Sequence, residues 1–327
     1  MPELTMLQAI REAMDEEMAR DPNVFVLGED VGVKGGVFLA TDGLFQKYGA
    51  HRVIDTPIAE SGIVGVAIGA SLVGMRPVAE IQFADYILPA IDQILNEAAR
   101  FRYRSNGTWS CPLVVRAPFG AGVHGGLYHS QSTEKLFCST PGLWVVIPSN
   151  PYDAKGLLKA AIRCDDPVIF FEHKRAYRSI KGAVPTQDYT VPLGKADVKR
   201  RGDDLTVITY GLAVQEALQA ADEIARQGVS VEIVDLRTLH PLDKDCVLES
   251  VKKTGKVLII HEDIKTGGIG GEIAAIIAEE AFDYLDAPIR RLGAPDVPSV
   301  PFNDAYERYV VPDVARMAKA MHDLAKY

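Results

Sequence analysis

The sequence is poor in cysteine and has no long apolar run. Its four cysteines are Cys111, Cys138, Cys164 and Cys246, and their wide spacing forms no CxxC pair or metal-finger pattern. A chain of 327 residues needs no disulfides to fold, so we expect reduced thiols. No apolar run approaches the roughly 18 residues that span a membrane. The opening MPELTMLQAIREAMDEEMAR is acidic and amphipathic, unlike a signal peptide. We therefore expect a cytoplasmic protein with no membrane partner.

Positive charge is also in short supply. Lys and Arg together number 35 against 44 Asp and Glu, and the formal net charge of -9 repels a polyphosphate backbone. Nucleic acid is therefore not an expected partner. The hydrophobic content of 47% and charged content of 24% are ordinary for a globular protein, and the length suits two α/β domains.

The glycine clusters match no nucleotide-binding pattern. The run GGIGGEI after KVLIIHED offers Gly268 and Gly270, but Ile273 stands where GxGxxG needs its third glycine. The run GKV at 255–257 lacks the upstream glycine and the hydroxyl residue of a P-loop. These failures argue against a nicotinamide dehydrogenase and against a kinase or ATPase, and they leave the glycines a structural role at a helix start.

What the sequence does contain is a repeated alternation of apolar strands and helical stretches. Runs such as NVFVLG, PLVVRAP and PVIFFEH are apolar almost throughout, which is typical of parallel strands covered on both faces. Thr5 is placed to cap an opening helix. We expect an α/β fold of two domains, with mainly parallel sheets covered by helices. The domains span residues 1–180 and 205–327, and residues 181–204 form a linker. The expected helices lie near residues 60–73, 85–104, 132–139, 151–163, 213–227, 243–253 and 269–285.

Glu60 opens a helix whose following residues, SGIVGVAIGASL, are almost all small or apolar. Two interpretations stay open. The carboxylate complements the helix dipole in an ordinary first turn, or it is a desolvated acid that faces a heterocyclic nitrogen. In the second case the small residues after it allow the helix and a ligand to approach closely.

A strand-to-helix turn carries Gln82, Phe83 and Tyr86 in EIQFADYILPAIDQI. Aromatic residues at such a turn usually pack in the core. They also provide a flat wall for an aromatic ring, with Gln82 reading the ring's polar edge. The spacing alone does not choose between these interpretations.

The segment APFGAGVHGGLYHSQSTEKLF combines tight glycine turns with two histidines and several hydroxyls. His129 is the stronger candidate for chemistry and His124 the weaker, while a surface histidine without a role is the alternative. Ser132 and Glu134 are expected to cap the next helix. No serine lies in a GxSxG elbow, so a serine-hydrolase triad is not indicated.

Taken together, these motifs resemble the beta subunit of the thiamine-dependent decarboxylase component of 2-oxo acid dehydrogenase complexes. The resemblance covers essentially the whole chain. It rests on GEDVG, DTPIAESGIVGVAIG, EIQFADYILPAIDQI, the histidine segment, IPSNPYDAKGLL, DLRTLHPLD and HED followed by GG. It implies a transketolase-like fold, in which a thiamine pyrimidine-binding domain precedes a C-terminal domain. It also implies an α2β2 heterotetramer with an alpha subunit.

The resemblance assigns roles to particular positions. Glu60 is implied to hydrogen-bond the aminopyrimidine ring of thiamine diphosphate and so to promote formation of the carbanion nucleophile. Phe83 and Tyr86 are implied to line the pyrimidine, with Ile58 and Gln82 nearby. His129 is implied to transfer protons during decarboxylation or during acyl transfer to a lipoyl group.

The family also binds the cofactor's diphosphate, a magnesium ion and a potassium ion. Its diphosphate and magnesium are held by a GDG motif and a later Asn pair, and no GDG occurs here. The alpha subunit is therefore implied to supply them, and the active site to lie between two chains. A potassium ion is implied near backbone carbonyls, although Cys164 stands where Asp is commoner. The matching residues are Leu113, Ala161, Ile162, Cys164 and Asp166.

The resemblance leaves the substrate and one rival function open. IQFADYI and GLYHSQS resemble branched-chain members more than pyruvate-specific members, and acetoin is a further alternative. A hypothesis of another class is a non-catalytic assembly subunit of the complex. Both hypotheses are compatible with docking of the C-terminal domain on the subunit-binding domain of a lipoyl acyltransferase core.

Overall fold

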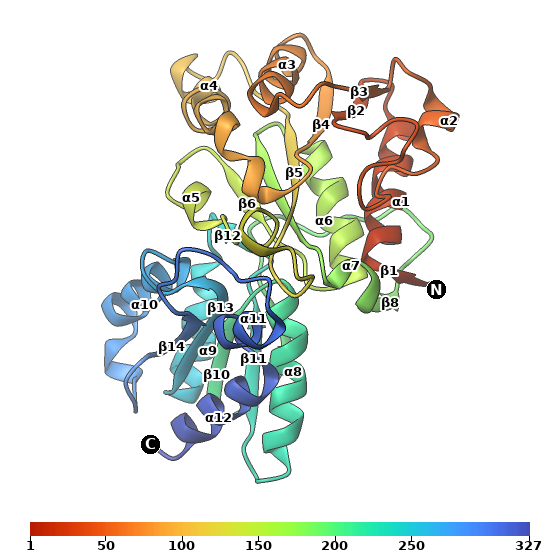
Figure 1. The fold of residues 1–327 in the computed structure, drawn as a ribbon. Helices are drawn as coiled ribbons and strands as arrows, with labels where there is room; N and C mark the ends of the chain where they lie inside the picture. The colour runs from red at the N-terminus through yellow and green to blue at the C-terminus, as the bar shows by residue number, and fades with distance from the viewer. The chain divides into compact units, whose positions relative to one another are not determined.

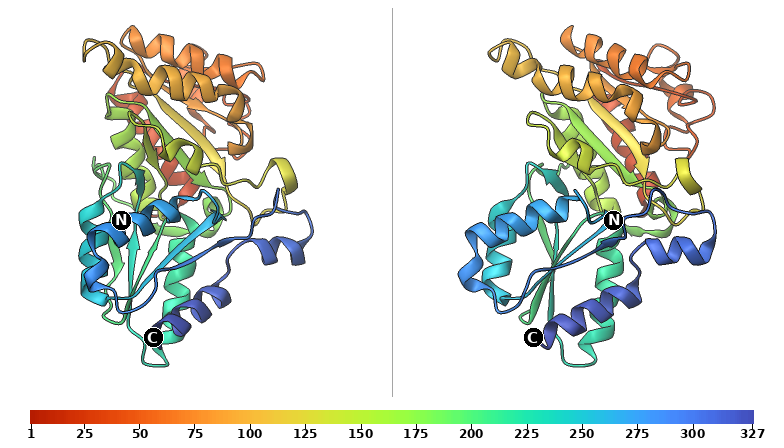
Figure 2. Two further views of the ribbon diagram at one scale, coloured as in Figure 1. Left: turned by 90° about the vertical axis from the view of Figure 1, so that its left-hand side faces the viewer. Right: turned by 60° about the vertical axis from the view of Figure 1, so that its left-hand side comes forward.

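The computed structural model describes residues 1–327, which fold into two compact units. Unit 1 comprises residues 1–119 and 136–193, and unit 2 comprises residues 120–135 and 194–327. Figures 1 and 2 show that each unit is built on its own sheet with helices packed against it. The two α/β folds expected from the sequence are confirmed. No helix in either unit is long and apolar enough to span a bilayer.

Unit 1 is organised around a parallel sheet in which the strands lie in the order β6-β7-β5-β4-β2-β3. Nearly every residue of these strands is buried, because helices cover both faces of the sheet. The strands are β2 (Val24–Gly28), β3 (Val53–Asp55), β4 (Arg76–Glu80), β5 (Val114–Phe119), β6 (Trp144–Val146) and β7 (Val168–His173).

In unit 1, the helices expected near residues 60–73 and 151–163 begin and end close to those positions. Thr5 caps the first helix, since its Oγ1 accepts a hydrogen bond from the Gln8 amide at 3.2 Å and Gln8 Oε1 accepts one from the Thr5 amide at 2.9 Å. The helices are α1 (Met6–Arg20), α2 (Leu44–Tyr48), α3 (Glu60–Leu72), α4 (Phe101–Arg104), α5 (Lys135–Cys138), α6 (Pro151–Arg163) and α7 (Ala176–Ser179).

The single helix expected over residues 85–104 is instead a chain of short helical pieces. Pro89 lacks an amide donor and its ring hinders the carbonyl four residues earlier, so a regular α-helix cannot run through it. The backbone stays helical but changes pitch from 3-10 to π and back. The pieces are η1 (Ala84–Tyr86), η2 (Leu88–Ala90), the π-helical η3 (Gln93–Glu97), η4 (Ala98–Arg100) and α4.

Unit 2 contains a five-stranded sheet in the order β14-β13-β10-β11-β9, of which only β9 is antiparallel to its neighbour. Helices α8 and α12 cover one face, where Val214, Ala217, Met317 and Met321 are buried. The five strands of this sheet are β9 (Asp197–Arg200), β10 (Leu205–Thr209), β11 (Val231–Asp235), β13 (Val257–Ile264) and β14 (Arg290–Ala294), and the short strand β12 (Thr238–His240) lies outside it. The helices are η5 (Gly126–Tyr128), α8 (Leu212–Ala225), α9 (Lys244–Thr254), α10 (Ile269–Glu280), η6 (Phe282–Tyr284), α11 (Asp304–Val310) and α12 (Val314–Ala325).

The segment 181–204 differs from the linker expected there. Its first residues form β8 (Lys181–Ala183), which pairs antiparallel with β1 (Glu3–Thr5), and β9 near its end pairs with β11. Both strands are short and lack an apolar pattern, so their partners determine them more than their own residues do.

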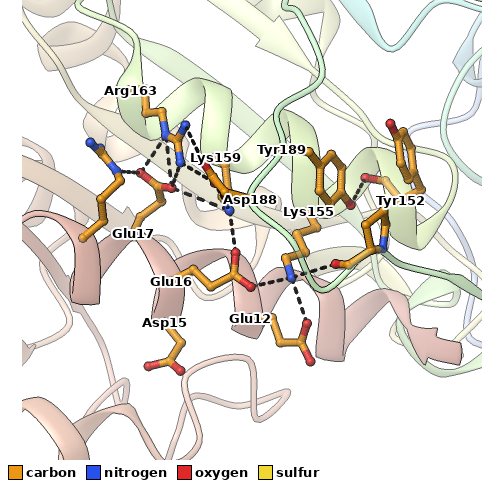
Figure 3. Close-up of polar contacts among 12 residues, drawn as sticks. Glu12, Asp15, Glu16, Glu17, Tyr152, Lys155, Lys159, Arg163, Asp188 and Tyr189 are labelled. Carbon is orange, nitrogen blue, oxygen red and sulfur yellow. Dashed lines mark hydrogen bonds and ion pairs between the residues drawn. The ribbon is translucent and has the colours of Figure 1, made fainter. Parts of the chain in front are cut away.

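An ion-pair cluster between α1 and α6 fixes part of this segment to unit 1 (Figure 3). Three bases lie one turn apart on α6, three acids lie on α1, and Asp188 joins them from the segment. Lys159 Nζ lies 2.5 Å from Glu16 and 2.6 Å from Asp188, and Arg163 Nη2 lies 2.6 Å from Glu17. Hydrogen bonds from Arg163 and then Lys159 hold the pKa of Asp188 well below its usual range. We call Glu12, Glu16, Glu17, Lys155, Lys159, Arg163 and Asp188 the α1–α6 cluster.

Candidate active site

Three neighbouring strands of unit 1 end in register, and the residues that follow them carry the candidate side chains. Gly28 at the end of β2 is paired with Asp55 on β3 and with Glu80 on β4. In a parallel sheet, the segments after such strand ends gather at one edge, where ligands usually bind. The expected site residues Ile58, Glu60, Gln82, Phe83 and Tyr86 all lie in these segments.

Glu60 is the first residue of α3 and is half-buried. It faces a second acid, Glu29, which directly follows β2. Burial raises the pKa of Glu29, and the negative charges of Asp30 and Glu60 raise it further, while a hydrogen bond from Gln82 opposes the shift. A helix dipole favours one acid at this position but does not account for two facing each other. The raised pKa of Glu29 marks this strand edge as a candidate functional site.

The sequence did not single out Glu29, although a signal was present. It lies in GEDVG immediately after a buried strand, where the carboxyl edge of a parallel sheet is expected to carry functional groups. Its neighbour Gly32 is equally constrained, because its amide donates to Asp55 Oδ1 at 2.6 Å and an added Cβ would lie 2.4 Å from Asp55 Oδ2.

Phe83 lies at the centre of an aromatic group. Its ring centroid is 5.4 Å from that of Phe38 and 6.0 Å from that of Tyr86, and both pairs meet edge to face. The Lys174 ammonium lies 5.7 Å from the Phe83 centroid. Phe83 and Tyr86 are only half-buried, so they are not simple core residues.

A buried charged network lies beneath this edge of the sheet. Arg116 on β5 is fully buried and bridges two carboxylates at 2.7 Å, Glu80 on β4 and Glu172 on β7. Tyr177 donates to Glu172 at 2.5 Å, and its ring lies 5.4 Å from Phe38. Burial raises the pKa of Glu80, and Arg116 opposes that shift. The network links the strands rigidly under the aromatic group.

His129 belongs to unit 2, in the segment 120–135, which we call the histidine loop. It follows η5 and is half-buried. Position 125 must be a glycine, because a Cβ added to Gly125 would lie 2.7 Å from the Cβ of His129. The weaker candidate, His124, is occupied: its Nδ1 lies 2.6 Å from Glu307 Oε2.

Carboxylates of unit 2 hold the histidine loop. Glu262 Oε1 accepts from the Ala121 amide at 2.6 Å, and Glu307 Oε1 accepts from the Gly122 amide at 2.7 Å. Glu134 does not cap the next helix as expected. It is fully buried and accepts from the Tyr210 hydroxyl at 2.7 Å, since a polar group placed under the loop needs a partner there. Ser132 likewise donates its hydroxyl to Glu262 Oε1 at 3.3 Å.

The carbonyls expected near potassium already accept hydrogen bonds. Arg76 Nη1 donates to Ile162 at 3.1 Å and to Cys164 at 3.0 Å, and the carbonyls of Ala161 and Leu113 accept from backbone amides at 3.2 and 2.8 Å. The Asp166 carboxylate accepts from Arg102 Nε at 2.5 Å. Potassium stays a prediction, and no step below depends on it.

The chain is similar to known proteins over its whole length. It is 60% identical to the 2-oxoisovalerate dehydrogenase subunit beta of Bacillus subtilis (strain 168), over 99% of both chains. The chain belongs to the beta-subunit family of 2-oxo acid dehydrogenases. Two further beta subunits of this family are similar to it. The pyruvate dehydrogenase E1 component subunit beta of Bacillus subtilis (strain 168) is 52% identical over 93% of this chain and 94% of its own. The mitochondrial 2-oxoisovalerate dehydrogenase subunit beta of Dictyostelium discoideum is 53% identical over 95% of this chain and 83% of its own.

The two halves of this beta-subunit chain match separate domain families. Residues 2–180 match the transketolase pyrimidine binding domain, and residues 194–317 match the transketolase C-terminal domain. A solved structure described as a split gene transketolase, inactive beta4 tetramer, is similar with a TM-score of 0.80 and 25% identity, over 99% of this chain and 98% of that one. The transketolase-like fold implied by the sequence motifs is confirmed.

Proposed function

We propose that this chain is the subunit that activates thiamine diphosphate in the decarboxylase of a branched-chain 2-oxo acid dehydrogenase complex. One observation carries the proposal. At the carboxyl edge of the parallel sheet, Glu29 feels the charge of Glu60 at the start of α3 and accepts a hydrogen bond from Gln82, which directly precedes the aromatic pair of Phe83 and Tyr86. A carboxylate beside an aromatic wall suits a heterocycle with a basic nitrogen.

The two acids suit proton exchange with that heterocycle. Thiamine diphosphate, when bound, supplies the carbanion nucleophile for decarboxylation. Glu60 is the group that exchanges a proton with the ring nitrogen, because it starts the helix at the strand edge. Repulsion from Glu29 favours a proton shared between the acids and the ring over two bare carboxylates. Gln82 holds Glu29 in place through its hydrogen bond.

The exposed apolar face of α3 is evidence for a partner chain. The helix is apolar on every side, and such helices are normally buried all round. Yet Val66 is 63% exposed, and Ile58 just before the helix is 74% exposed. An added Cβ at Gly65 or Gly69 would meet no atom within 4 Å, so nothing in this chain requires a glycine at either position. A close-packed neighbouring subunit accounts for both the apolar surface and the glycines.

The remaining parts of the proposal follow from the family. An alpha subunit completes an α2β2 tetramer and holds the diphosphate and magnesium, for which this chain has no GDG motif. His129 transfers protons during decarboxylation or acyl transfer to lipoyl groups. The lipoyl acyltransferase core binds through its subunit-binding domain, and the location is the cytoplasm. The higher identity to a 2-oxoisovalerate dehydrogenase subunit, 60% against 52% for a pyruvate dehydrogenase subunit, favours branched-chain substrates.

The proposal is tested by coexpression with a GDG-bearing alpha chain. We expect decarboxylation of 3-methyl-2-oxobutanoate to exceed that of pyruvate and to require both thiamine diphosphate and magnesium. Glu60→Gln should lower kcat by about 100-fold or more, since general acid and base catalysis contributes on that scale. The exposed Glu223→Gln on α8 is the matched control. Full activity of the isolated chain would refute the partner, and a normal rate for Glu60→Gln would refute the role of Glu60.

A further inference from the structure

The histidine loop is surrounded by acids. Glu262 and Glu307 accept from its backbone, Glu134 lies within it, and Asp263 contacts Lys135 at its end, with Oδ1 3.2 Å from Nζ. We call Glu134, Glu262, Asp263 and Glu307 the loop carboxylates. Glu134, Asp263 and Glu307 are buried and Glu262 is half-buried. Neighbouring buried carboxylates repel one another unless protons or cations neutralise them.

Glu134 is the most buried of these acids, with no exposed surface. Its Oε1 accepts from Tyr210, but its Oε2 has no hydrogen-bond partner, and Asp263 Oδ2 has none either. Burial is the largest cause that raises the pKa of Glu134 to about 8, followed by repulsion from Asp263. Burial also raises the pKa of Asp263, although Lys135 opposes the shift. A carboxyl group in these surroundings keeps its proton at neutral pH.

The charged and titratable groups around the histidine loop come from several elements, and of these Asp263, Tyr210 and Glu262 act directly on Glu134. Tyr210 follows β10, and Lys135 belongs to the loop itself. Strand β13 contributes three consecutive groups, and burial lowers the pKa of the first of them, His261, to about 4, so it is neutral. Arg291 on β14 acts on His261, and Glu307 on α11 contacts His124. The three groups of β13 are His261, Glu262 and Asp263.

We propose that Glu134 is a positioning residue: its carboxylic acid form holds the histidine loop in unit 2 and thereby fixes His129, and loss of the proton releases the loop. This inference rests on the proposed function only for the task of His129. A bare carboxylate at Glu134 would be repelled by both Asp263 and Glu262, and no donor contacts its Oε2 to stabilise the charge. The loop then relieves the repulsion by moving Glu134 into water.

The sign of the pH effect follows from the direction of the pKa shift. Glu134 binds its proton more tightly in the closed loop than in water, so the loop gains stability at low pH and loses it as pH rises toward about 8. Opening should become more favourable by up to about tenfold per pH unit over the part of this range that lies above pH 5. Above pH 8 the dependence should level off.

Hydrogen exchange of the full chain measures the opening directly. Peptides covering residues 120–135 are followed between pH 6 and pH 8, and exchange is expressed as protection relative to the intrinsic rate. For the wild type we expect protection to fall at least about tenfold across this range. Glu134→Gln keeps the size and the neutral state of the acid form, so its protection should not change with pH.

Two further variants complete the test. Glu223→Gln should keep the wild-type slope. Tyr210→Phe removes a donor that stabilises the charged form of Glu134, so its transition should move to higher pH. This variant also serves if Glu134→Gln does not fold. An unchanged pH slope in Glu134→Gln, or an unmoved transition in Tyr210→Phe, would overturn the proposal.

The assembled enzyme gives a second readout. With the alpha chain present, the pH dependence of kcat should lose its alkaline decline in Glu134→Gln and keep it in Glu223→Gln. If the assembled wild type does not decarboxylate 2-oxo acids, the proposed function fails. The exchange measurements on the single chain still decide the role of Glu134.

Discussion

The two units bury charge in opposite ways. In unit 1, the acids of the α1–α6 cluster face three bases of α6, and Arg20 adds a fourth at 2.8 Å from Glu17. The result is a lowered pKa for Asp188. In unit 2, four loop carboxylates share Lys135 and His124, and the pKa of Glu134 is raised to about 8. Buried charge that is matched by counter-charge gives a fixed structure, whereas surplus acid gives a group that still titrates near neutral pH.

Removing one base from the α1–α6 cluster should destabilise unit 1. Lys159 is 1% exposed, and Lys159→Met removes one of the two lysines that contact Glu16 and a counter-charge 4.0 Å from the fully buried Glu17. We expect a loss of about 3 kcal/mol in the unfolding free energy of unit 1. Both tryptophans, Trp109 and Trp144, lie in unit 1, so urea unfolding followed by tryptophan fluorescence reports on it selectively.

The matched control for this prediction is Lys319→Met on α12. Lys319 and Asp323 form an exposed pair one turn apart, and such pairs contribute less than about 0.5 kcal/mol. An equal effect of the two substitutions, measured for the respective units, would show that the α1–α6 cluster is no stronger than an ordinary surface pair.

Neutralising Glu134 should reduce the pH dependence of the stability of unit 2. Because its pKa is raised in the folded chain, its contribution to stability is full below about pH 4.5 and is lost as pH rises toward 8. The stability of unit 2 should therefore fall by up to about 1.4 kcal/mol per pH unit more in the wild type than in Glu134→Gln. Calorimetry at pH 5.5 and pH 7.5 measures the difference. Parallel pH profiles for the two proteins would contradict the raised pKa.

The smallest effect is expected for Asp188→Asn. Asp188 is largely exposed, so solvent screens its contacts with Lys159 and Arg163, and we expect a loss below about 1 kcal/mol at pH 7. Its pKa is lowered in the folded chain, so this contribution is present above about pH 4 and is lost at lower pH. Fluorescence-detected unfolding at pH 7 and pH 3 should show the difference shrinking. A loss that grew toward pH 3 would reverse the assigned sign.

Local signals predicted much of the fold. The bounds of α3 and α6 were close to those expected, because a run of small apolar residues and an Asn-Pro start mark them within a few residues. The helix over 85–104 was misjudged because apolar spacing does not distinguish α from 3-10 or π backbone. The strand β8 was missed because its pairing with β1 joins segments far apart in the sequence.

The candidate site was predictable where it follows strand ends and not where it depends on packing. Glu60, Gln82 and Phe83 were selected from motifs next to apolar runs, and the structure places them after strand ends that lie in register, while their roles stay a prediction. The bridge of Arg116 between Glu80 and Glu172 depends on which strands are neighbours, and no local pattern states that. The burial of Glu134 was missed for the same reason, since its partner Tyr210 lies in another part of the chain.

The discontinuity of unit 1 affects the order in which the chain becomes structured during synthesis. The histidine loop is made early, in the middle of unit 1, but the groups that hold it come much later: Tyr210, Glu262 and finally Glu307, close to the end at Tyr327. Domains generally fold from the N-terminus as they emerge from the ribosome. Unit 1 can therefore settle while His129 is still untethered, and a prematurely terminated chain would keep Glu60 at the start of α3 without an ordered histidine loop.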